Sequence, residues 1–306
     1  MEKTVKWKYP QFIVSCDWLN ERQNDKSIRI YDCTTYLAYK DDDPETPYDI
    51  ISGFSEYQSA HIPNSAFIDI QKHLSKQNSQ YSFTLQSLPE LKKNFESLGI
   101  GEQYHIILYS RNGAQWATRV WWMLFALGVE RISILDGGYN EWVRSGLKTT
   151  SGINKFEPST FKPAFKEHIF VGKESPLKGI NDNSCILLNS LTRDIHSGDN
   201  PRYGRCGRIP KSVNIPFHDF LDTKTGKLKS PKEALDIVTE NNIHSNKKII
   251  NYCGGGIAAT LDAFVLLQLG FENLEIYDNS MSEWAKTKLY PLRQTFQEGC
   301  EKNIAT

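Results

Sequence analysis

This sequence of 306 residues has little that would direct it to a membrane, a nucleic acid or a disulfide scaffold. It contains no apolar run near the roughly 20 residues that a membrane-spanning helix needs. Its 36 basic and 36 acidic residues cancel, so no overall field attracts nucleic acid or anionic lipid. Its six cysteines form no C-x-x-C pair and are sparse for this length, which indicates a reducing compartment.

The N-terminal residues also lack the features of a targeting segment. They contain no apolar stretch and are not rich in arginine or serine, so neither a secretion signal nor a transit peptide is evident. We therefore expect a cytoplasmic protein that binds neither membranes nor nucleic acids. The hydrophobic content of 39% supports well-packed cores, and the length suggests two domains of ordinary size.

One cysteine, Cys253, stands directly before three glycines. Residues 249–252 read as a short strand, and the apolar pattern after the glycines predicts a helix that ends at Gly270. Backbone N–H groups converge at such a junction and the helix dipole is positive, which favours the thiolate and makes the sulfur nucleophilic. We predict that the backbone of five residues wraps around the sulfur and whatever the sulfur carries: Gly254, Gly255, Gly256, Ile257 and Ala258.

Several other residues have simpler structural interpretations. A buried core position is the alternative for Cys253, but a place at a strand end before three glycines argues against it. We expect Cys16, Cys33 and Cys185 in the core, Cys206 in a loop where it is a weaker candidate for a second reactive thiol, and Cys300 in an inert tail. We expect Trp121, Trp122, Trp142 and Trp284 in core or inter-domain packing, His61 as a structural hydrogen-bonding residue, and residues 41–43 as a solvated acidic loop rather than a metal site.

The chain repeats itself at a nearly constant offset. Glu141-Trp142 matches Glu283-Trp284 at an offset of 142 residues, and Tyr109-Ser110 matches Tyr252-Cys253 at an offset of 143. The position of Cys253 is therefore taken by Ser110 in the first copy. A serine hydroxyl cannot form a persulfide, so the repeat predicts one copy with a reactive thiol and one without.

Each copy alternates short apolar strands with helices. Strands are expected at residues 28–31, 106–109 and 132–135, and at 186–188, 248–250 and 274–277. Helices are expected to open at Ser87 and Ser230, the second with a capping box through Glu233. This pattern predicts an α/β fold of two domains, each a mainly parallel sheet flanked by helices: residues 1–150, an irregular linker at 151–173, and residues 174–306. Reactive groups in such sheets lie beyond the carboxyl ends of the strands, where Cys253 falls.

The order of the motifs resembles the tandem-domain rhodanese-like sulfurtransferases, which include thiosulfate and 3-mercaptopyruvate sulfurtransferases. The resemblance covers most of the chain. In the first half it rests on Tyr31-Asp32-Cys33, His61-Ile62-Pro63, Arg119-Val120-Trp121-Trp122 and Asp136-Gly137-Gly138-Tyr139-Asn140-Glu141-Trp142. In the second half it rests on Arg208-Ile209-Pro210, Cys253-Gly254-Gly255-Gly256 and Asp278-Asn279-Ser280-Met281-Ser282-Glu283-Trp284.

This resemblance implies a catalytic second domain and an inactive first one, as the pair Cys253 and Ser110 suggests. It implies that Cys253 takes a sulfur atom from a small anionic donor as a persulfide. The persulfide then passes the sulfur to cyanide, a thiol or a thioredoxin-like protein. No metal, flavin or pyridine nucleotide is required by this chemistry.

The sequence departs from the family pattern around the donor. Leu191 stands where an arginine usually helps to hold the donor, and we consider Arg193 as its substitute, with Arg208 as a further cation of the site. Arg202 and Arg205 are other cations in the same region. The all-glycine loop has neither the basic residues of many thiosulfate enzymes nor the serine of many mercaptopyruvate enzymes. We predict a thiosulfate sulfurtransferase, with 3-mercaptopyruvate as the alternative donor.

Two other functions compete with this prediction. A related phosphatase would need Cys-x5-Arg, but the sixth residue after Cys253 is Ala259, so the arginine that clamps phosphate is missing. A non-catalytic sulfur-relay or regulatory protein would explain Leu191 and Ser110. Cys253 argues against it, because a scaffold does not need a thiol in a cradle of N–H groups.

Overall fold

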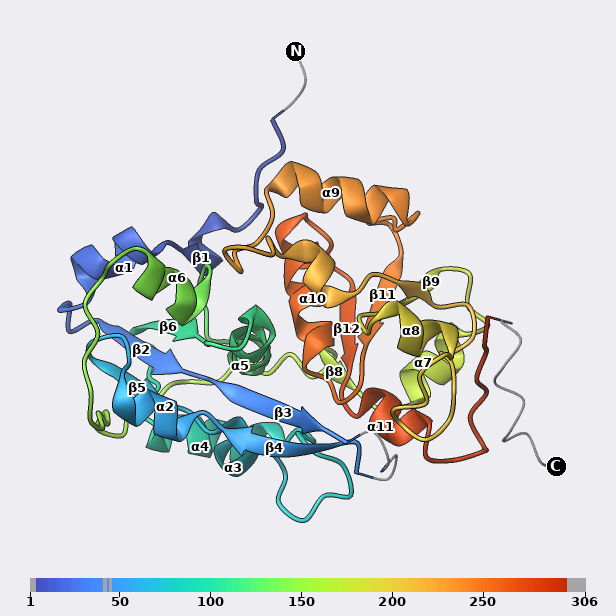
Figure 1. Cartoon of the computed structure of the whole chain (residues 1–306), viewed down its shortest axis with the longest axis horizontal. Helices are drawn as coiled ribbons and strands as arrows, with labels where there is room; N and C mark the ends of the chain where they lie inside the picture. Colours follow the sequence, from blue (N-terminus) through green and yellow to red (C-terminus); the bar gives the residue numbers. More distant parts are fainter. Residues whose placement is uncertain (1–3, 41–42, 44–45, 296–306) are drawn as a thin grey trace.

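The computed structural model describes residues 4–40, 43 and 46–295 (Figure 1). Asp41, Asp42 and Cys300 lie outside these residues, and the predictions made for them stay untested. Within the described ranges, no helix is both long enough and apolar enough to cross a bilayer.

Strands and helices alternate along both halves of the chain. The strands are β1 (Ile13–Val14), β2 (Ile28–Asp32), β3 (Thr35–Tyr39), β4 (Tyr48–Ser52), β5 (Ser65–Phe67), β6 (His105–Tyr109), β7 (Ile132–Leu135), β8 (Phe170–Val171), β9 (Cys185–Asn189), β10 (Val213–Asn214), β11 (Lys248–Tyr252) and β12 (Leu274–Tyr277). The helices are α1 (Cys16–Arg22), α2 (Phe54–Ser59), α3 (Ile70–His73), α4 (Leu88–Ser97), α5 (Ala114–Ala126), α6 (Gly138–Arg144), α7 (Glu174–Gly179), α8 (Arg193–Ser197), α9 (Pro231–Glu240), α10 (Ala258–Gln268) and α11 (Ser280–Trp284), with short 3-10 helices η1 (Pro10–Phe12) and η2 (Phe217–Phe220).

Two five-stranded parallel sheets form the centres of two domains. The first has the order β1-β7-β6-β2-β5 and the second the order β10-β9-β11-β12-β8. Read from opposite ends, the two orders match strand for strand, so the sequence repeat is a repeat of topology. The predicted α/β fold with helix-flanked parallel sheets is confirmed, and so are the six predicted strands.

The matched helices α4 and α9 begin as their sequences predict. Ser87 and Ser230 are the N-cap residues, and Glu90 and Glu233 return a side-chain contact to the cap in a capping box. A proline lies in the first turn of each helix, where its missing N–H removes no helical hydrogen bond. Local sequence alone therefore determines where these helices start.

The structure differs from the sequence expectations at the edges of the sheets. Residues 170–171 form β8, which pairs with β12 and extends the second sheet, although they fall in the segment expected to be an irregular linker. A two-residue strand leaves no recognisable apolar period. The antiparallel hairpin of β3 and β4 was not predicted either, and it has no counterpart among the described strands of the second domain. In Figure 1 this hairpin extends from the first domain toward the second.

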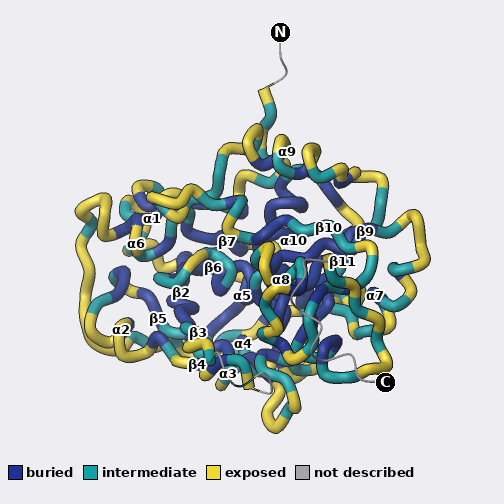
Figure 2. Tube along the Cα trace, turned by 45° about the vertical axis from the view of Figure 1, so that its right-hand side comes forward, coloured by how far each residue is buried: buried dark blue, intermediate teal, exposed yellow. Residues whose placement is uncertain are grey.

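Helices α5 and α10 pack against each other between the two sheets, and Figure 2 shows both as deeply buried chain. The equivalent residues Thr118 and Thr260, 142 apart, meet there with hydroxyl oxygens 2.8 Å apart. The indole of Trp122 donates to the carbonyl of Thr260 at 2.9 Å, and Trp121 contacts Phe264 edge-on. The predicted core or inter-domain role of these tryptophans is confirmed, since one apolar core runs through the interface.

In each domain, an equivalent segment crosses over and contacts the other domain. The segment before α4 crosses to the second domain, where the N–H of Leu85 donates to the carboxylate of Asp278 at 2.7 Å. The segment before α9 crosses back, and the N–H of Leu228 donates to Asp136 at 2.8 Å. Both pairs of equivalent residues lie 142 or 143 positions apart in the sequence. This reciprocal exchange gives the pair of domains an approximate two-fold symmetry.

Candidate functional site

Cys253 lies where the sequence places it, immediately after β11 and five residues before the start of α10. Its residue surface is only 2% exposed. Its carbonyl oxygen accepts the N–H of Met281 at 3.1 Å, and the carbonyl of Gly254 accepts the N–H of Ser282 at 2.8 Å. The start of α11 therefore holds the loop in position from one side.

Two glycines of the loop are required by close approaches. A Cβ atom on Gly254 would collide with the hydroxyl of Tyr203, and one on Gly256 would collide with the carbonyl oxygen of Asp278. Gly256 also has a φ of +73°, in the left-handed region that favours glycine. These contacts explain why the loop carries glycine rather than a larger residue at both positions.

The backbone N–H groups of the loop are available for an anion. In the described part of the chain, those of residues 254–258 form no hydrogen bond. They precede or open α10, a helix of 11 residues whose dipole is positive at this end. Free N–H groups at a helix start suit an anion, and the cradle of Gly254, Gly255, Gly256, Ile257 and Ala258 around the sulfur stays a prediction.

Ser280 anchors Cys253 itself. Its hydroxyl accepts the N–H of Cys253 at 3.0 Å and donates to the carbonyl of Tyr277 at 2.7 Å. Ser280 adopts a left-handed φ of +49°, whereas the equivalent residue of the first domain is Gly138 with a φ of +57°. The second domain thus keeps a hydroxyl at a position where glycine is less strained.

We expect Ser280→Ala to lower the free energy of unfolding by about 1–3 kcal/mol, because it leaves the buried N–H of Cys253 without an acceptor. The value of kcat/KM should fall several-fold in a sulfur-transfer assay. Ser280→Gly is the matched control, since it relieves the left-handed strain and should cost less stability at the same loss of activity. Equal activity in the wild type and both variants would contradict the anchoring role.

A cavity of about 110 Å³ opens over Cys253 between the two domains. The first domain contributes one wall from the β3–β4 hairpin and the start of α5. The second domain contributes the cysteine loop, Leu191 and the residues near α8. Its lining residues are Leu37, Tyr39, Tyr48, Phe83, Gln115, Trp116, Leu191, Thr192, Ile195, Arg202, Tyr203, Phe217, Cys253, Gly254, Gly255, Ile257 and Ala258.

Arg202 is the one cation among these described lining residues. Its guanidinium lies 4.1 Å from the ring centroid of Tyr39, a cation–π contact that joins the two domains at the cavity. Burial raises the pKa of Tyr48 to about 12 and that of Tyr203 well above its usual value. Both phenols therefore stay protonated at neutral pH and add no negative charge to the cavity.

Neither arginine selected from the sequence lines the cavity. The Arg193 side chain is 71% exposed and pairs with the carboxylate of Asp219 at 2.6 Å. The Arg208 guanidinium donates to the carbonyl of His196 at 3.0 Å and to the hydroxyl of Thr295 at 2.9 Å. Their assignment as donor-binding residues stays a prediction without geometric support. Arg202 comes from the same arginine-rich connection, but sequence alone could not show which arginine turns inward.

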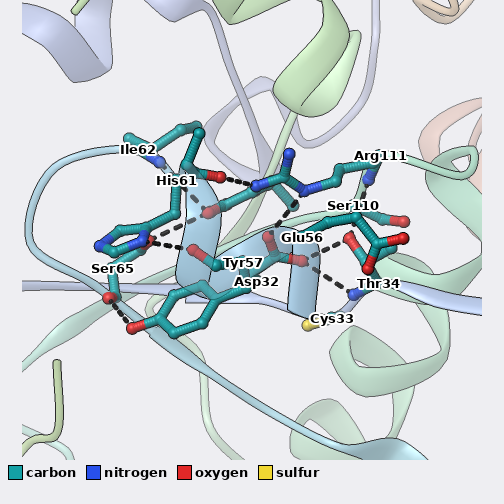
Figure 3. A network of polar contacts seen from close by, with 12 residues as sticks. Asp32, Cys33, Thr34, Glu56, Tyr57, His61, Ile62, Ser65, Ser110 and Arg111 are labelled. Atoms are coloured by element: carbon teal, nitrogen blue, oxygen red, sulfur yellow. Dashed lines mark hydrogen bonds and ion pairs between the residues drawn. The ribbon is translucent and has the colours of Figure 1, made fainter. Parts of the chain in front are cut away.

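The first domain contains the counterpart of this site around Ser110, and its loop is closed by internal contacts (Figure 3). The N–H of Arg111 donates to the hydroxyl of Thr34 at 3.0 Å, and that of Asn112 donates to the hydroxyl of Ser110 at 3.0 Å. The Arg111 side chain turns toward the buried carboxylate of Asp32, with Nε 3.5 Å from Oδ2. Helix α5 starts four residues after Ser110, whereas α10 starts five residues after Cys253.

Three other described cysteines have thiols whose pKa is raised by burial. Burial raises the pKa of Cys16 to about 12 and that of Cys185 to about 11. Burial also raises the pKa of the fully enclosed Cys33 well above its usual value. These three thiols stay protonated at neutral pH; Cys16 and Cys33 are buried as expected, whereas Cys185 is only partly buried.

Comparison with known proteins agrees with this architecture. The model of the rhodanese-like domain matches residues 15–145 and 192–287. A 3-mercaptopyruvate sulfurtransferase of Escherichia coli K12 is 30% identical over 276 residues, covering 89% of this chain and 94% of that protein. A thiosulfate sulfurtransferase of Mus musculus is 30% identical over 282 residues, covering 89% and 91%.

Solved structures show the same fold over most of the chain. The crystal structure of SseA from Escherichia coli, described as a 3-mercaptopyruvate sulfotransferase, matches with a TM-score of 0.73 and 27% identity over 88% of this chain and 98% of that one. Tum1 of Saccharomyces cerevisiae matches with a TM-score of 0.79 at 18% identity, over 94% and 100% of the chains, and so shares the fold. With two matched domains and a cysteine loop at the expected strand end, the chain belongs to the rhodanese-like family of sulfurtransferases.

Proposed function

We propose that this protein transfers sulfane sulfur from thiosulfate to a thiophilic acceptor through a persulfide on Cys253. One observation carries the proposal: the Cys253 thiol lies in a small inter-domain cavity with free loop N–H groups and one arginine, Arg202. A donor anion bound there would meet a nucleophile, hydrogen-bond donors and a countercharge together. The cavity of about 110 Å³ suits a donor of a few atoms.

The chemistry has two displacement steps. The Cys253 thiolate attacks the outer sulfur of thiosulfate, an S–S bond to the cysteine forms, and sulfite leaves with the electron pair of the broken bond. Cyanide or a thiolate then attacks the outer sulfur of the persulfide, and the Cys253 thiolate leaves with the electron pair of that bond. The loop N–H groups would stabilise negative charge on sulfur before and after the first step.

An unpaired polar atom of the cavity supports a bound anion. The indole N–H of Trp116 is buried and forms no hydrogen bond with any described residue. Trp116 lines the cavity from the first domain. A buried donor without a partner is costly, so a substrate oxygen accepting from it would recover that free energy. The inactive domain would thus complete the donor site.

The donor and the enzyme activity are tested by one experiment. Purified protein is incubated separately with thiosulfate and with 3-mercaptopyruvate, and the mass of the peptide containing Cys253 is measured for one added sulfur atom. An adduct with thiosulfate is the expected result. An adduct with 3-mercaptopyruvate alone would support the second candidate, which the relatives of that name favour. No adduct with either donor would contradict the enzymatic proposal and favour a non-catalytic role.

Arg202 rather than Arg193 should hold the donor. A hydrogen bond to a charged group contributes about 1.5–3 kcal/mol, so Arg202→Ala should raise the KM for thiosulfate roughly 10- to 100-fold and change kcat less. Arg193→Ala should leave KM unchanged, because its guanidinium is exposed and paired with Asp219. Steady-state kinetics with varied thiosulfate distinguish the two. The opposite ranking of the variants would restore the assignment made from the sequence.

A further inference from the structure

The first domain contains a second, larger cavity that shares no lining residue with the Cys253 cavity. Its volume is about 600 Å³, within the range of about 300–1,000 Å³ typical of small-molecule sites. It lies beside the edge strand β5, between the last residue of β4, the starts of α2 and α3, and the end of α4. Residues 153–156 of the connection between the domains close one side.

The cavity is lined by aromatic rings. Phe54 and Phe67 contact each other with ring centroids 5.4 Å apart, and Tyr31 meets Phe156 edge-on at 5.3 Å. The hydroxyl of Tyr31 donates to the carbonyl of Leu98 at 3.0 Å, so this ring presents an apolar surface. Phe54 is 37% exposed. An aromatic body would find stacking partners on more than one side.

The mouth of the cavity combines an apolar residue with positive charge. Ile153 is 54% exposed, and the exposed Lys72 and Lys155 form no ion pair with any described residue. The one lining carboxylate, that of Asp69, accepts the N–H of Lys72 at 2.9 Å as the cap of α3. Burial lowers the pKa of His73, so this lining imidazole is neutral at pH 7. Two lysines against one engaged carboxylate leave the mouth positive.

The cavity also contains an unused polar group. The hydroxyl of Ser52, at the end of β4, is buried and forms no hydrogen bond with any described residue. A ligand that fills the cavity could give it a partner. A ligand that matches this cavity would have an aromatic body for the walls, a negative group for the mouth and a hydrogen-bonding atom for the hydroxyl of Ser52.

We propose that this cavity binds a small amphipathic anion, with an aromatic body between Phe54 and Phe156 and one carboxylate or sulfonate group at Lys72 and Lys155. The site is independent of sulfur transfer at Cys253. It would give the catalytically inactive domain a binding function of its own.

The probe for the test is 8-anilinonaphthalene-1-sulfonate, an aromatic sulfonate whose fluorescence rises in apolar surroundings. Titration of the full chain should show one saturable site. Ile153→Glu places a negative charge in the mouth, and the double variant Lys72→Gln/Lys155→Gln removes the positive charges. Each should raise the Kd about tenfold or more, while turnover with thiosulfate stays unchanged.

Matched controls separate this cavity from general surface effects. Val143→Glu alters an exposed apolar residue elsewhere, and Lys93→Gln/Lys178→Gln removes two exposed lysines outside the cavity. Both should leave the Kd within about twofold of the wild-type value. Near-UV circular dichroism checks that each variant keeps its tertiary structure, and the lysine variant decides the question if Ile153→Glu does not fold.

Three results would overturn the proposal. Probe binding without saturation would mean that no defined site exists. If the control variants weaken probe binding equally, the probe responds to surface charge in general. Displacement of the probe by excess thiosulfate would place it in the Cys253 cavity, a result that leaves the proposed sulfur transfer intact.

Discussion

A Cys253→Ser variant should lose at least about 10³-fold in kcat/KM with any sulfur donor, because the nucleophile of a covalent mechanism is removed. Its fold should persist. The backbone contacts of Cys253 with Met281 and Ser280 do not involve the sulfur, and the side chain changes by one atom. We expect a change of about 1 kcal/mol or less in the free energy of unfolding. Turnover, thermal unfolding and the mass of the donor-treated protein measure the three effects.

The repeat supplies a stringent control for this variant. Ser110→Cys places a thiol at the equivalent position of the first domain, yet we expect no second active site. The N–H groups of Arg111 and Asn112 already donate to the hydroxyls of Thr34 and Ser110. Sulfur transfer by a Cys253→Ser/Ser110→Cys double variant would show that the cysteine alone, and not its cradle, makes the site.

The centre of each sheet could be predicted from the sequence, whereas the edges could not. Strands β2, β6 and β11 have five residues each, of which three or four are apolar and at least four are buried, a pattern that short windows detect. The edge strands β1, β8 and β10 have two residues each, too few to show a period. Their pairing depends on the neighbouring strand, which is distant in the sequence.

The candidate site also has one part that the sequence predicts and another part that it does not. Cys253 and its loop could be found because strand, glycines and helix are contiguous, so local sequence contains the signal. The opposite wall comes from Tyr48, Trp116 and their neighbours, more than 130 residues away in the sequence. Arg202 and Arg193 have the same charge and differ only in where tertiary packing directs them, so composition could not distinguish them. Pairing of Arg193 with Asp219, across 26 residues, is likewise a tertiary contact.

Arg119 shows how the inactive domain supports the active loop, and its loss should have the second large effect. The guanidinium is fully buried and donates to the carbonyl of Gly256 at 3.1 Å, to Asp278 at 2.7 Å and to the carbonyl of Phe83 at 2.7 Å. The equivalent residue of the second domain is Leu261, which has no such group. The contact therefore runs in one direction, from the inactive domain to the loop of Cys253.

Arg119→Leu should lower the free energy of unfolding by about 3–5 kcal/mol, because it leaves the largely buried Asp278 carboxylate without its cation. It should also lower kcat/KM about tenfold, since the carbonyl of Gly256 loses its donor and the cradle loosens. Arg119→Lys keeps the positive charge, but its ammonium group cannot reach the three acceptors that the planar guanidinium reaches. Its stability and its kcat/KM should therefore lie between those of the wild type and those of Arg119→Leu.

The ion pair between the half-exposed Arg144 and Glu141 provides the comparison. Its arginine side chain is 45% exposed, so Arg144→Leu should change stability by no more than about 0.5 kcal/mol and leave kcat/KM unchanged. Chemical denaturation and steady-state kinetics on the three variants test both readouts. An Arg119→Leu protein as stable and as active as the Arg144→Leu protein would show that the buried inter-domain contact does not position the loop. A loss of stability with full activity would confine Arg119 to the interface and separate it from the chemistry at Cys253.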